Sequence, residues 1–331
     1  MNDLTILAFD PRTLAPEAAA LLPRLTDEDA AVRRIALIEL ADLEDPDALQ
    51  PIVAALKHDA SSDVRSEAAR VLGAWEQHDI IEALCNALRD TDDNVREAAA
   101  SSLSALKQTS SGAVLCVWAD DPAPFVQRAI LRALRELRCA DAFAPALRAL
   151  EHEDSNVRIE AVGVLGWLKD ARALAPLADI AVRDATAEIR RTAVGALGFA
   201  LADDPVTSPA LLHALVDPAW QVREEAATTL GKLRAKSARD ALIAALDDAY
   251  WQVRLRAARG LGQLGDRVAA QPLVALLSHA ISNLRKEAAL ALGELRDPST
   301  AAALRLALDD PDPEVRKAVR IALQQIDAAT Q

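Results

Sequence analysis

The sequence predicts an all-α protein, an α-solenoid of about ten helical hairpins stacked side by side. The first observation is a recurring pair, a β-branched residue or leucine followed by an arginine, which we call the landmark arginine. Successive copies lie 31 to 33 residues apart, a period typical of stacked repeat arrays. The copies are Val32-Arg33, Val64-Arg65, Val95-Arg96, the degenerate Val126-Gln127, Val157-Arg158, Ile189-Arg190, Val222-Arg223, Val253-Arg254, Leu284-Arg285 and Val315-Arg316.

The second observation is helical spacing within each period, which residues 45–76 illustrate. A first helix is predicted over residues 46–57, because Leu49, Ile52, Val53 and Leu56 fall on one face. Pro51 lies in its first turns, where a missing N–H costs little. The low aromatic content of 3%, within a hydrophobic content of 51%, indicates a core of Leu, Ala, Val and Ile that suits close helix packing.

A polar turn over residues 58–63 follows, and a serine or aspartate before the Val-Arg pair is a natural N-cap for the next helix. A second helix is predicted from about Val64 to Trp75, with Ala68, Val71 and Leu72 on its apolar face. Such a hairpin cannot bury its apolar face alone, so neighbouring hairpins must stack.

Two further periodic features indicate how the hairpins stack. An aspartate six residues before the landmark arginine can form a ladder of charge-assisted hydrogen bonds along the stack, so that Arg190 satisfies Asp184 and its turn. A glycine eight residues after the arginine indicates close approach to the next repeat, since glycine inside a helix costs about 1 kcal/mol relative to alanine. The aspartates are Asp27, Asp59, Asp90, Asp121, Asp184, Asp217, Asp248 and Asp310, and the glycines are Gly73, Gly166, Gly198, Gly231, Gly262 and Gly293.

The combined pattern A-x-x-P-L-x-x-A-L-x-D-x-x-x-x-V-R-x-x-A-x-x-A-L-G-x-L resembles the HEAT-like repeats of the family named after the phycobilisome lyases. Val164-Leu165-Gly166, Ala196-Leu197-Gly198 and Ala291-Leu292-Gly293 fit its Ala-Leu-Gly segment. The resemblance covers residues 14–326 and implies an α-α superhelix of HEAT-like hairpins. The family includes lyase subunits, scaffolds and assembly factors, so the resemblance implies the fold more than the function.

We expect one continuous solenoid over residues 1–331, with a first repeat at about 14–44 and a C-terminal capping repeat at about 298–327. Four and eight residues after the landmark arginine, where other repeats carry small or apolar residues, the last repeat has Arg320 and Gln324. Polar residues at these stacking positions are typical of a cap.

Charge and composition narrow the function classes. A net charge of −13 argues against nucleic-acid binding, which needs excess Lys and Arg. The N-terminal segment lacks a basic region typical of a secretory signal, and no apolar run approaches the roughly 20 residues that span a membrane. Cys85, Cys116 and Cys139 have no metal-ligand spacing. We therefore expect a soluble, cytoplasmic, monomeric protein with no cofactor.

The second helices line the concave face of such arrays, and positions one, five and nine after the arginine point away from the core. In repeats five and six these positions hold apolar residues or glycines. They are Ile159, Gly163 and Trp167 in repeat five, and Gly195 and Phe199 in repeat six. An exposed apolar patch predicts a partner-binding surface. The alternative is that Trp167 and Phe199 fold back over the adjoining loop.

Repeat four, which lacks its landmark arginine, carries Arg128, Arg132 and Arg135 on its second helix. This cluster suits a partner with a carboxylate or an acidic segment. The alternative is a solvated helix face with ordinary charge pairs to Glu136.

Trp220 and Trp251 stand three residues before the arginine in repeats seven and eight, with Tyr250 beside them. Other repeats carry small or polar residues at this position. The aromatic side chains are either interaction anchors or a hydrophobic clasp over the rim.

His152 and His279 replace the ladder aspartate in two repeats. A histidine titrates near neutral pH, but we expect each to be neutral and to make a hydrogen bond within its turn. Three acidic residues surround His152 in the sequence, namely Glu151, Glu153 and Asp154, and such a group could suggest a metal site. We do not expect one, because the group has a single histidine and its carboxylates belong to one turn.

These observations favour a non-enzymatic scaffold or assembly factor that binds a protein partner on its concave face. We expect it to bind neither nucleic acid nor a membrane. The alternative is a phycobilin-lyase-like subunit. The resemblance implies that such a subunit would attach a chromophore, holding a tetrapyrrole between Trp167, Phe199 and the arginines of repeat four.

Overall fold

The computed structural model describes residues 14–330, which form helices joined by short turns and contain no strand. The predicted all-α solenoid is confirmed. The expectation of no secretory signal concerns mainly residues 1–13, which lie outside the described residues. The chain divides into two compact parts at Leu168 and Lys169, and each part is described by itself.

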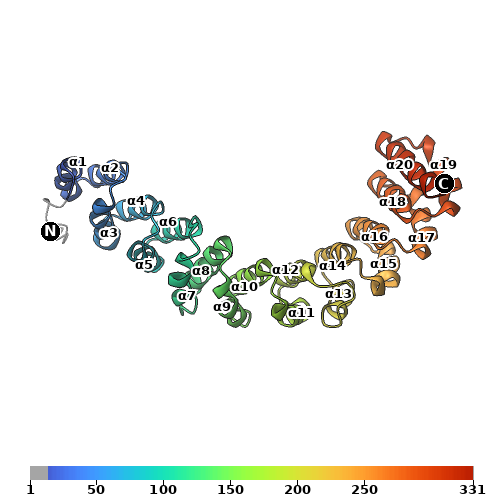
Figure 1. Cartoon of the computed structure of the whole chain (residues 1–331), viewed down its shortest axis with the longest axis horizontal. Helices are drawn as coiled ribbons and strands as arrows, with labels where there is room; N and C mark the ends of the chain where they lie inside the picture. The colour runs from blue at the N-terminus through green and yellow to red at the C-terminus, as the bar shows by residue number, and fades with distance from the viewer. Residues whose placement is uncertain (1–13, 331) are drawn as a thin grey trace. The chain divides into compact units, whose positions relative to one another are not determined.

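The first part contains five helical hairpins, each with a first and a second helix. Figure 1 shows α3, α5, α7 and α9 along one side of this part and α4, α6, α8 and α10 along the other. The helix pairs are α1 (Pro16–Leu21) with α2 (Ala30–Ala41), α3 (Leu49–His58) with α4 (Ser62–Leu72), α5 (His78–Ala87) with α6 (Asp93–Ser104), α7 (Ser111–Trp118) with α8 (Pro124–Leu137), and α9 (Phe143–Ala149) with α10 (Ser155–Leu168).

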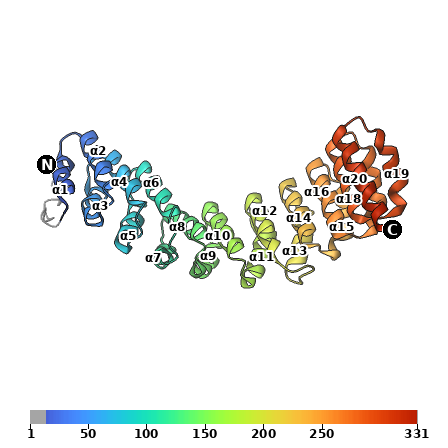
Figure 2. The same cartoon turned by 45° about the horizontal axis from the view of Figure 1, so that its top comes forward.

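The second part contains five more hairpins, so the described residues hold the ten that the period predicts. Figure 2 shows its second helices α12, α14 and α16 as a row. The pairs are α11 (Leu174–Arg183) with α12 (Ala187–Ala196), α13 (Thr207–Ala214) with α14 (Trp220–Leu233), α15 (Arg239–Ala244) with α16 (Trp251–Leu264), α17 (Ala270–Ala275) with α18 (Ser282–Leu295), and α19 (Ala301–Leu306) with α20 (Pro313–Thr330).

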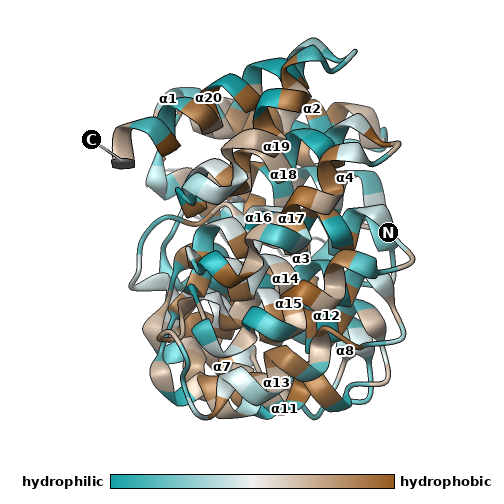
Figure 3. Cartoon of the chain, turned by 90° about the vertical axis from the view of Figure 1, so that its right-hand side faces the viewer, coloured by the Kyte–Doolittle hydropathy of each residue, from teal (hydrophilic) through white to brown (hydrophobic). Residues whose placement is uncertain are grey.

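The apolar residue of the repeating pair lies in the core of every hairpin after the first. From the second repeat to the last, the residue before the landmark position is at most 1% exposed. Apolar and polar segments alternate along the helices, which is the amphipathic pattern expected of stacked hairpins (Figure 3). Among residues 14–330, no helix combines the length and the apolar character needed to cross a membrane.

The glycines eight residues after the landmark arginine allow neighbouring second helices to approach closely. A Cβ atom on Gly262 would lie 2.9 Å from the Cα of Ala291, and one on Gly293 would lie 2.8 Å from the Cα of Ala322. Backbone this close leaves no room for a side chain, so the predicted cause of the glycines is confirmed in these repeats. Gly198 differs, since its nearest neighbour, Thr229 Cγ2, would be at an ordinary 3.9 Å.

The three cysteines are free thiols. Burial raises the pKa of Cys85, and that of Cys116, to about 12. Thiols with so high a pKa are poor nucleophiles near neutral pH.

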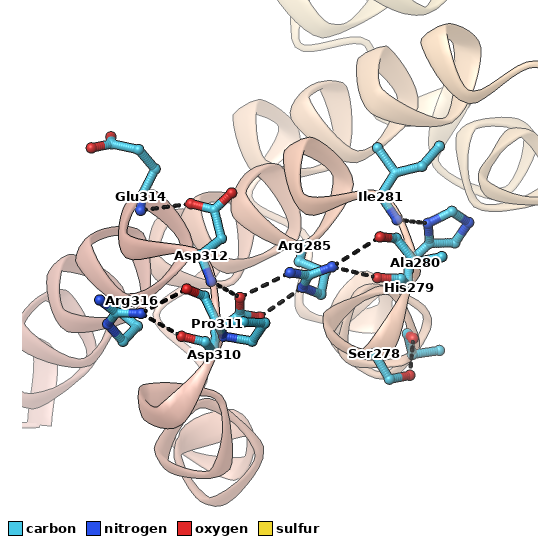
Figure 4. Close-up of polar contacts among 11 residues, drawn as sticks. Ser278, His279, Ala280, Ile281, Arg285, Asp310, Pro311, Asp312, Glu314 and Arg316 are labelled. Carbon is cyan, nitrogen blue, oxygen red and sulfur yellow. Dashed lines mark hydrogen bonds and ion pairs between the residues drawn. The ribbon is translucent and has the colours of Figure 1, made fainter.

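The predicted ladder forms in part, and it joins successive repeats. Several landmark arginines bind the aspartate of the next repeat instead of their own, whereas Arg96 pairs with Asp93. Arg285 donates two hydrogen bonds to the carboxylate of Asp310, at 2.7 and 2.9 Å (Figure 4). Its remaining nitrogen donates to the backbone oxygen of His279, six residues earlier, at 2.9 Å. We call this bidentate contact between successive repeats a rung.

The same rung recurs along both parts. Each aspartate also accepts a hydrogen bond from the backbone N–H two residues later, as Asp310 does from Asp312 at 2.8 Å. The expected contact of Arg190 with the Asp184 carboxylate is therefore wrong. The Arg190 guanidinium donates hydrogen bonds to the carboxylate of Asp217 and to the backbone oxygen of Asp184. The other rungs are Arg33–Asp59, Arg65–Asp90 and Arg223–Asp248.

Histidines interrupt the ladder. His152 and His279 each accept, through Nδ1, the backbone N–H two residues later, which confirms their predicted turn hydrogen bonds. His279 cannot supply a carboxylate to Arg254, whose Nη1 lies 3.2 Å from its Nε2. The Nε of Arg254 is buried and has no hydrogen-bond partner among the described residues.

We predict that Arg190→Ala lowers the free energy of unfolding by about 1–3 kcal/mol, because the buried carboxylate of Asp217 loses its two guanidinium donors and keeps only a backbone N–H. The side chains of Arg190 and Asp217 are only 12% and 4% exposed. Urea denaturation gives the value, with Arg254→Ala as the matched control. The control should lose less, because Arg254 contacts His279 and no carboxylate in the described part of the chain. Equal losses would show that the rung itself does not stabilise.

The rungs also predict a dependence of stability on pH. The hydrogen bond from Arg285 holds the pKa of Asp310 below its ordinary value, and Arg65 does the same for Asp90. Because the pKa is lower in the folded than in the unfolded state, this stabilisation is complete above the unfolded value of about 4 and is lost as the pH falls through the folded value.

We therefore expect the melting temperature to fall steeply between about pH 4 and pH 2. The Asp310→Asn variant should have a lower melting temperature than the unmodified protein at neutral pH. Its melting temperature should fall less on acidification, because the asparagine side chain has no charge to neutralise. Parallel pH profiles of the two proteins would contradict this account.

Candidate functional site

Helix α8 carries a stripe of cations, Arg128, Arg132 and Arg135, which continues to Arg138 just beyond its end; we call these four residues the arginine face. Spacings of four and three residues place Arg128, Arg132 and Arg135 on one side of the helix. The stripe lies in the acidic half of the chain. Residues 1–168 contain 16 Lys and Arg against 29 Asp and Glu, whereas residues 169–331 contain 21 of each.

Phe125, at the start of α8, organises one end of the arginine face. The guanidinium groups of Arg96 and Arg128 lie 5.4 and 5.1 Å from its ring centroid, which are cation–π distances. Beside Phe125, a cavity of about 250 Å³ opens between α6 and α8. Its lining residues are Glu97, Ala100, Ser101, Ser104, Phe125, Arg128, Ala129 and Arg132.

The arginines around this cavity are weakly neutralised. Arg128 lies 3.7 Å from Glu97, and both side chains are exposed, so the pair contributes little. Arg132 is exposed and makes no ion pair with any residue in the described range. The cavity between α6 and α8 is therefore open to solvent, and the guanidinium of Arg132 at its edge is available to donate hydrogen bonds.

Arg135 is bound within the fold. It donates to Glu160 of α10 at 2.7 Å and contacts Glu136 at 3.1 Å, so for this residue the alternative of charge pairs to Glu136 is observed. Burial raises the pKa of Glu160 and outweighs the opposing charges of Arg135, Arg132 and Arg128. A Cβ on Gly163 would lie 3.1 Å from Nη1 of Arg135, so the glycine gives this arginine room.

Trp167, near the end of α10, is 41% exposed, and its ring lies beneath the guanidinium of Arg138 at 4.3 Å. A second cavity, of about 180 Å³, is lined by Leu134, Arg135, Arg138, Val164, Trp167 and Leu168. Ile159 is half-buried. The first part thus brings Trp167 beside the arginine face.

The predicted partners of Trp167 in repeat six lie in the second part. Helix α12 ends at Ala196, and Phe199 is the last residue of a 3₁₀ turn, with a half-buried side chain. The position predicted for Phe199 from regular α-helical spacing is therefore only approximate. Gly195 makes room for Glu225, whose Oε1 would lie 3.2 Å from an added Cβ. A joint patch of Trp167 and Phe199 stays a prediction.

Trp220, Tyr250 and Trp251, which we call the aromatic edge, lie where α14 and α16 begin. The Trp220 and Tyr250 rings stack with centroids 5.4 Å apart and planes 14° from parallel. Tyr250 remains 45% exposed and Trp251 37% exposed. The stacking of Trp220 on Tyr250 is the contact expected of a hydrophobic clasp. Trp251 has the exposure expected of an interaction anchor.

Sequence reasoning missed Phe125, Arg96 and Arg138. Arg138 was detectable, because it continues the spacing of Arg128 and Arg135. Phe125 gave no periodic signal, since its contacts with Arg96 come from the preceding repeat. Among residues 14–330, no group of three or more His, Cys, Asp or Glu side chains is placed to hold a metal ion.

Comparisons with known proteins agree with this architecture. No curated protein matches the chain. An engineered protein of known structure is 21% identical, with a TM-score of 0.54, and the match covers 95% of this chain and 99% of that one. Escherichia coli YibA is 19% identical with a TM-score of 0.60, covering 81% of this chain and 98% of YibA.

The karyopherin Kap121p, in a structure bound to the extreme C-terminus of the protein phosphatase Cdc14p, is 16% identical with a TM-score of 0.62; the match covers 95% of this chain and 42% of Kap121p. These identities support the fold alone. The family model for HEAT repeats matches residues 18–104, 49–134, 113–198, 176–254 and 240–324, which overlap along nearly the whole chain. The chain therefore belongs to the HEAT repeat family.

Proposed function

We propose that this protein is a non-enzymatic binding scaffold or assembly factor that holds an acidic segment of a protein partner against the arginine face. The observation that carries the proposal is Arg132, which is exposed, lines the cavity between α6 and α8 and makes no ion pair within residues 14–330, on a helix whose Arg135 lines a second cavity with the exposed Trp167. Cytoplasmic location and a monomeric state belong to the same proposal.

Charge supports an acidic partner. The surrounding residues 1–168 carry net negative charge, so the arginine face is a local exception to which a carboxylate would be drawn. Guanidinium groups bind carboxylates through two parallel hydrogen bonds, and Arg132 has its donors available for this contact. The acidic surroundings would repel such a segment elsewhere, which favours one register.

The cavity beside Trp167 supports an apolar anchor next to the acidic residues. Its walls include Leu134, Val164 and the exposed ring of Trp167. Aromatic and arginine side chains are the residue types that contribute most binding free energy at protein interfaces. A leucine-sized side chain, followed by carboxylates along α8, would satisfy both features.

The alternative is a subunit similar to the phycobilisome lyases that binds a tetrapyrrole, whose propionates could pair with the same arginines. The cavities of about 250 and 180 Å³ are smaller than the roughly 300–1,000 Å³ of typical small-molecule sites, which favours side chains of a protein segment. Incubation with a tetrapyrrole followed by absorbance spectroscopy tests the alternative directly.

We predict that the double variant Arg132→Ala and Trp167→Ala weakens binding of a fluorescent peptide rich in glutamate and leucine by about tenfold or more. Fluorescence anisotropy measures the affinity. Melting should change little, because Arg132 is exposed and unpaired and Trp167 is half-exposed.

Arg148→Ala is the matched control, since Arg148 is an exposed arginine on the first helix α9, where it pairs with Asp120. It should bind the peptide like the unmodified protein. If the control loses as much affinity as the double variant, or if the double variant loses stability while binding is unchanged, the proposal is wrong.

A further inference from the structure

The first helices of the second part form the same groove twice. One groove, of about 500 Å³, lies between α13 and α15, and the other, of about 350 Å³, lies between α17 and α19. The eight residues that line the second groove are each 62 positions, two repeats, after a residue that lines the first. The walls of the first are Leu212, Leu215, Val216, Ala241, Ala244 and Ala245, and those of the second are Val274, Leu277, Ser278, Ala303, Leu306 and Ala307.

Both grooves are largely apolar and open to solvent. Val216 on one wall of the first groove is 75% exposed, and Leu306 on the opposite wall of the second is 84% exposed. Alanines in the walls of both grooves keep them wide. A single exposed apolar residue needs no explanation, but two equivalent apolar grooves on one surface mark an interaction site.

Each groove ends at an available carboxylate. Asp247 and Asp309 occupy equivalent positions, are exposed, and make no ion pair within the described part of the chain. The aspartates that follow them, Asp248 and Asp310, are instead bound by the rung arginines. A cation placed at the turn end of either groove therefore finds a free acid.

The aromatic edge borders the first groove and adds to this preference. Arg223 lines the groove, and its guanidinium lies 5.7 Å from the ring centroid of Tyr250. Tyr250 is already in contact with Trp220 and Arg223, so Trp251, which is 37% exposed, is the ring left to attract a lysine or arginine side chain.

We propose that these two grooves are a second docking surface, which binds a basic amphipathic helix of a protein partner lying across the first helices. Apolar side chains would enter the grooves, and lysine or arginine side chains would reach Asp247 and Asp309. Two helix layers span about 16–20 Å, and a helix of about 20 residues is about 30 Å long, so one helix reaches both grooves.

This surface is separate from the arginine face and has the opposite charge preference. The inference does not depend on the proposed function, because no residue is shared between the two sites.

The test uses the full chain and a fluorescent synthetic helix of about 20 residues, with leucines on one face and lysines on the other. The variants are Asp247→Lys with Asp309→Lys, and Val216→Ser with Leu306→Ser. All four side chains are exposed in full or in large part, so the fold should persist, which circular dichroism checks. Anisotropy should show binding about tenfold weaker for each pair.

Because the chain is acidic, a basic peptide could bind by charge alone. Asp47→Lys with Asp63→Lys makes the same charge change at exposed positions of the first part and should leave the affinity within about twofold. A peptide with serines in place of the leucines should bind weakly to every variant. The acidic peptide of the preceding test should bind all groove variants normally.

Equal loss in the control pair, unchanged affinity in both groove pairs, or no saturable binding would overturn the proposal. Sedimentation of the unmodified chain tests a different occupant. A dimer that dissociates on Val216→Ser with Leu306→Ser would assign the grooves to a second copy of the chain instead of a basic partner.

Discussion

The contact on which this structure depends is the bidentate hydrogen bond between the landmark arginine of one repeat and the turn aspartate of the next. It joins a second helix to the following turn, and the third nitrogen of the same guanidinium binds the turn of its own repeat. One side chain therefore fixes the spacing of two hairpins and satisfies backbone oxygens that a helical turn leaves without donors. Because the rungs are mostly buried, solvent screens them little.

Small residues recur where neighbouring second helices approach closely, with or without a rung. The backbone at Gly293 is too close to the next helix for a side chain at a junction that has the rung Arg285–Asp310, and the backbone at Gly262 is equally close at the junction where Arg254 meets His279. The apolar residue before each landmark arginine faces inward because the arginine faces the neighbouring turn. Charge pairing, close packing and core burial are thus consequences of one helical register.

Since the rungs consume most turn aspartates, the remaining charges define the surfaces. On α8 the landmark arginine is absent, while Arg128, Arg132 and Arg135 extend along one side of the helix. In the second part, Asp247 and Asp309 lie one residue before the rung aspartates and make no ion pair with any residue from 14 to 330. The two surfaces therefore differ in sign although they use the same repeat, which suits a scaffold whose repeats are alike in the core and different outside.

The sequence by itself determined the repeat period, the two helices of each hairpin, the identity of the ladder residues and the cause of the glycines, because each is encoded within about 31 residues. It also located Arg128, Arg132 and Trp167 on second-helix faces, since helical spacing alone places them there. Only the tertiary structure decided which aspartate each arginine binds, because Arg190 and Asp217 lie in different repeats and come together by stacking. The same reason hid Phe125 and its two arginines, and the paired grooves of the second part. Sequence periodicity reports which side chains share a helix face, but contacts between faces follow from how the hairpins stack.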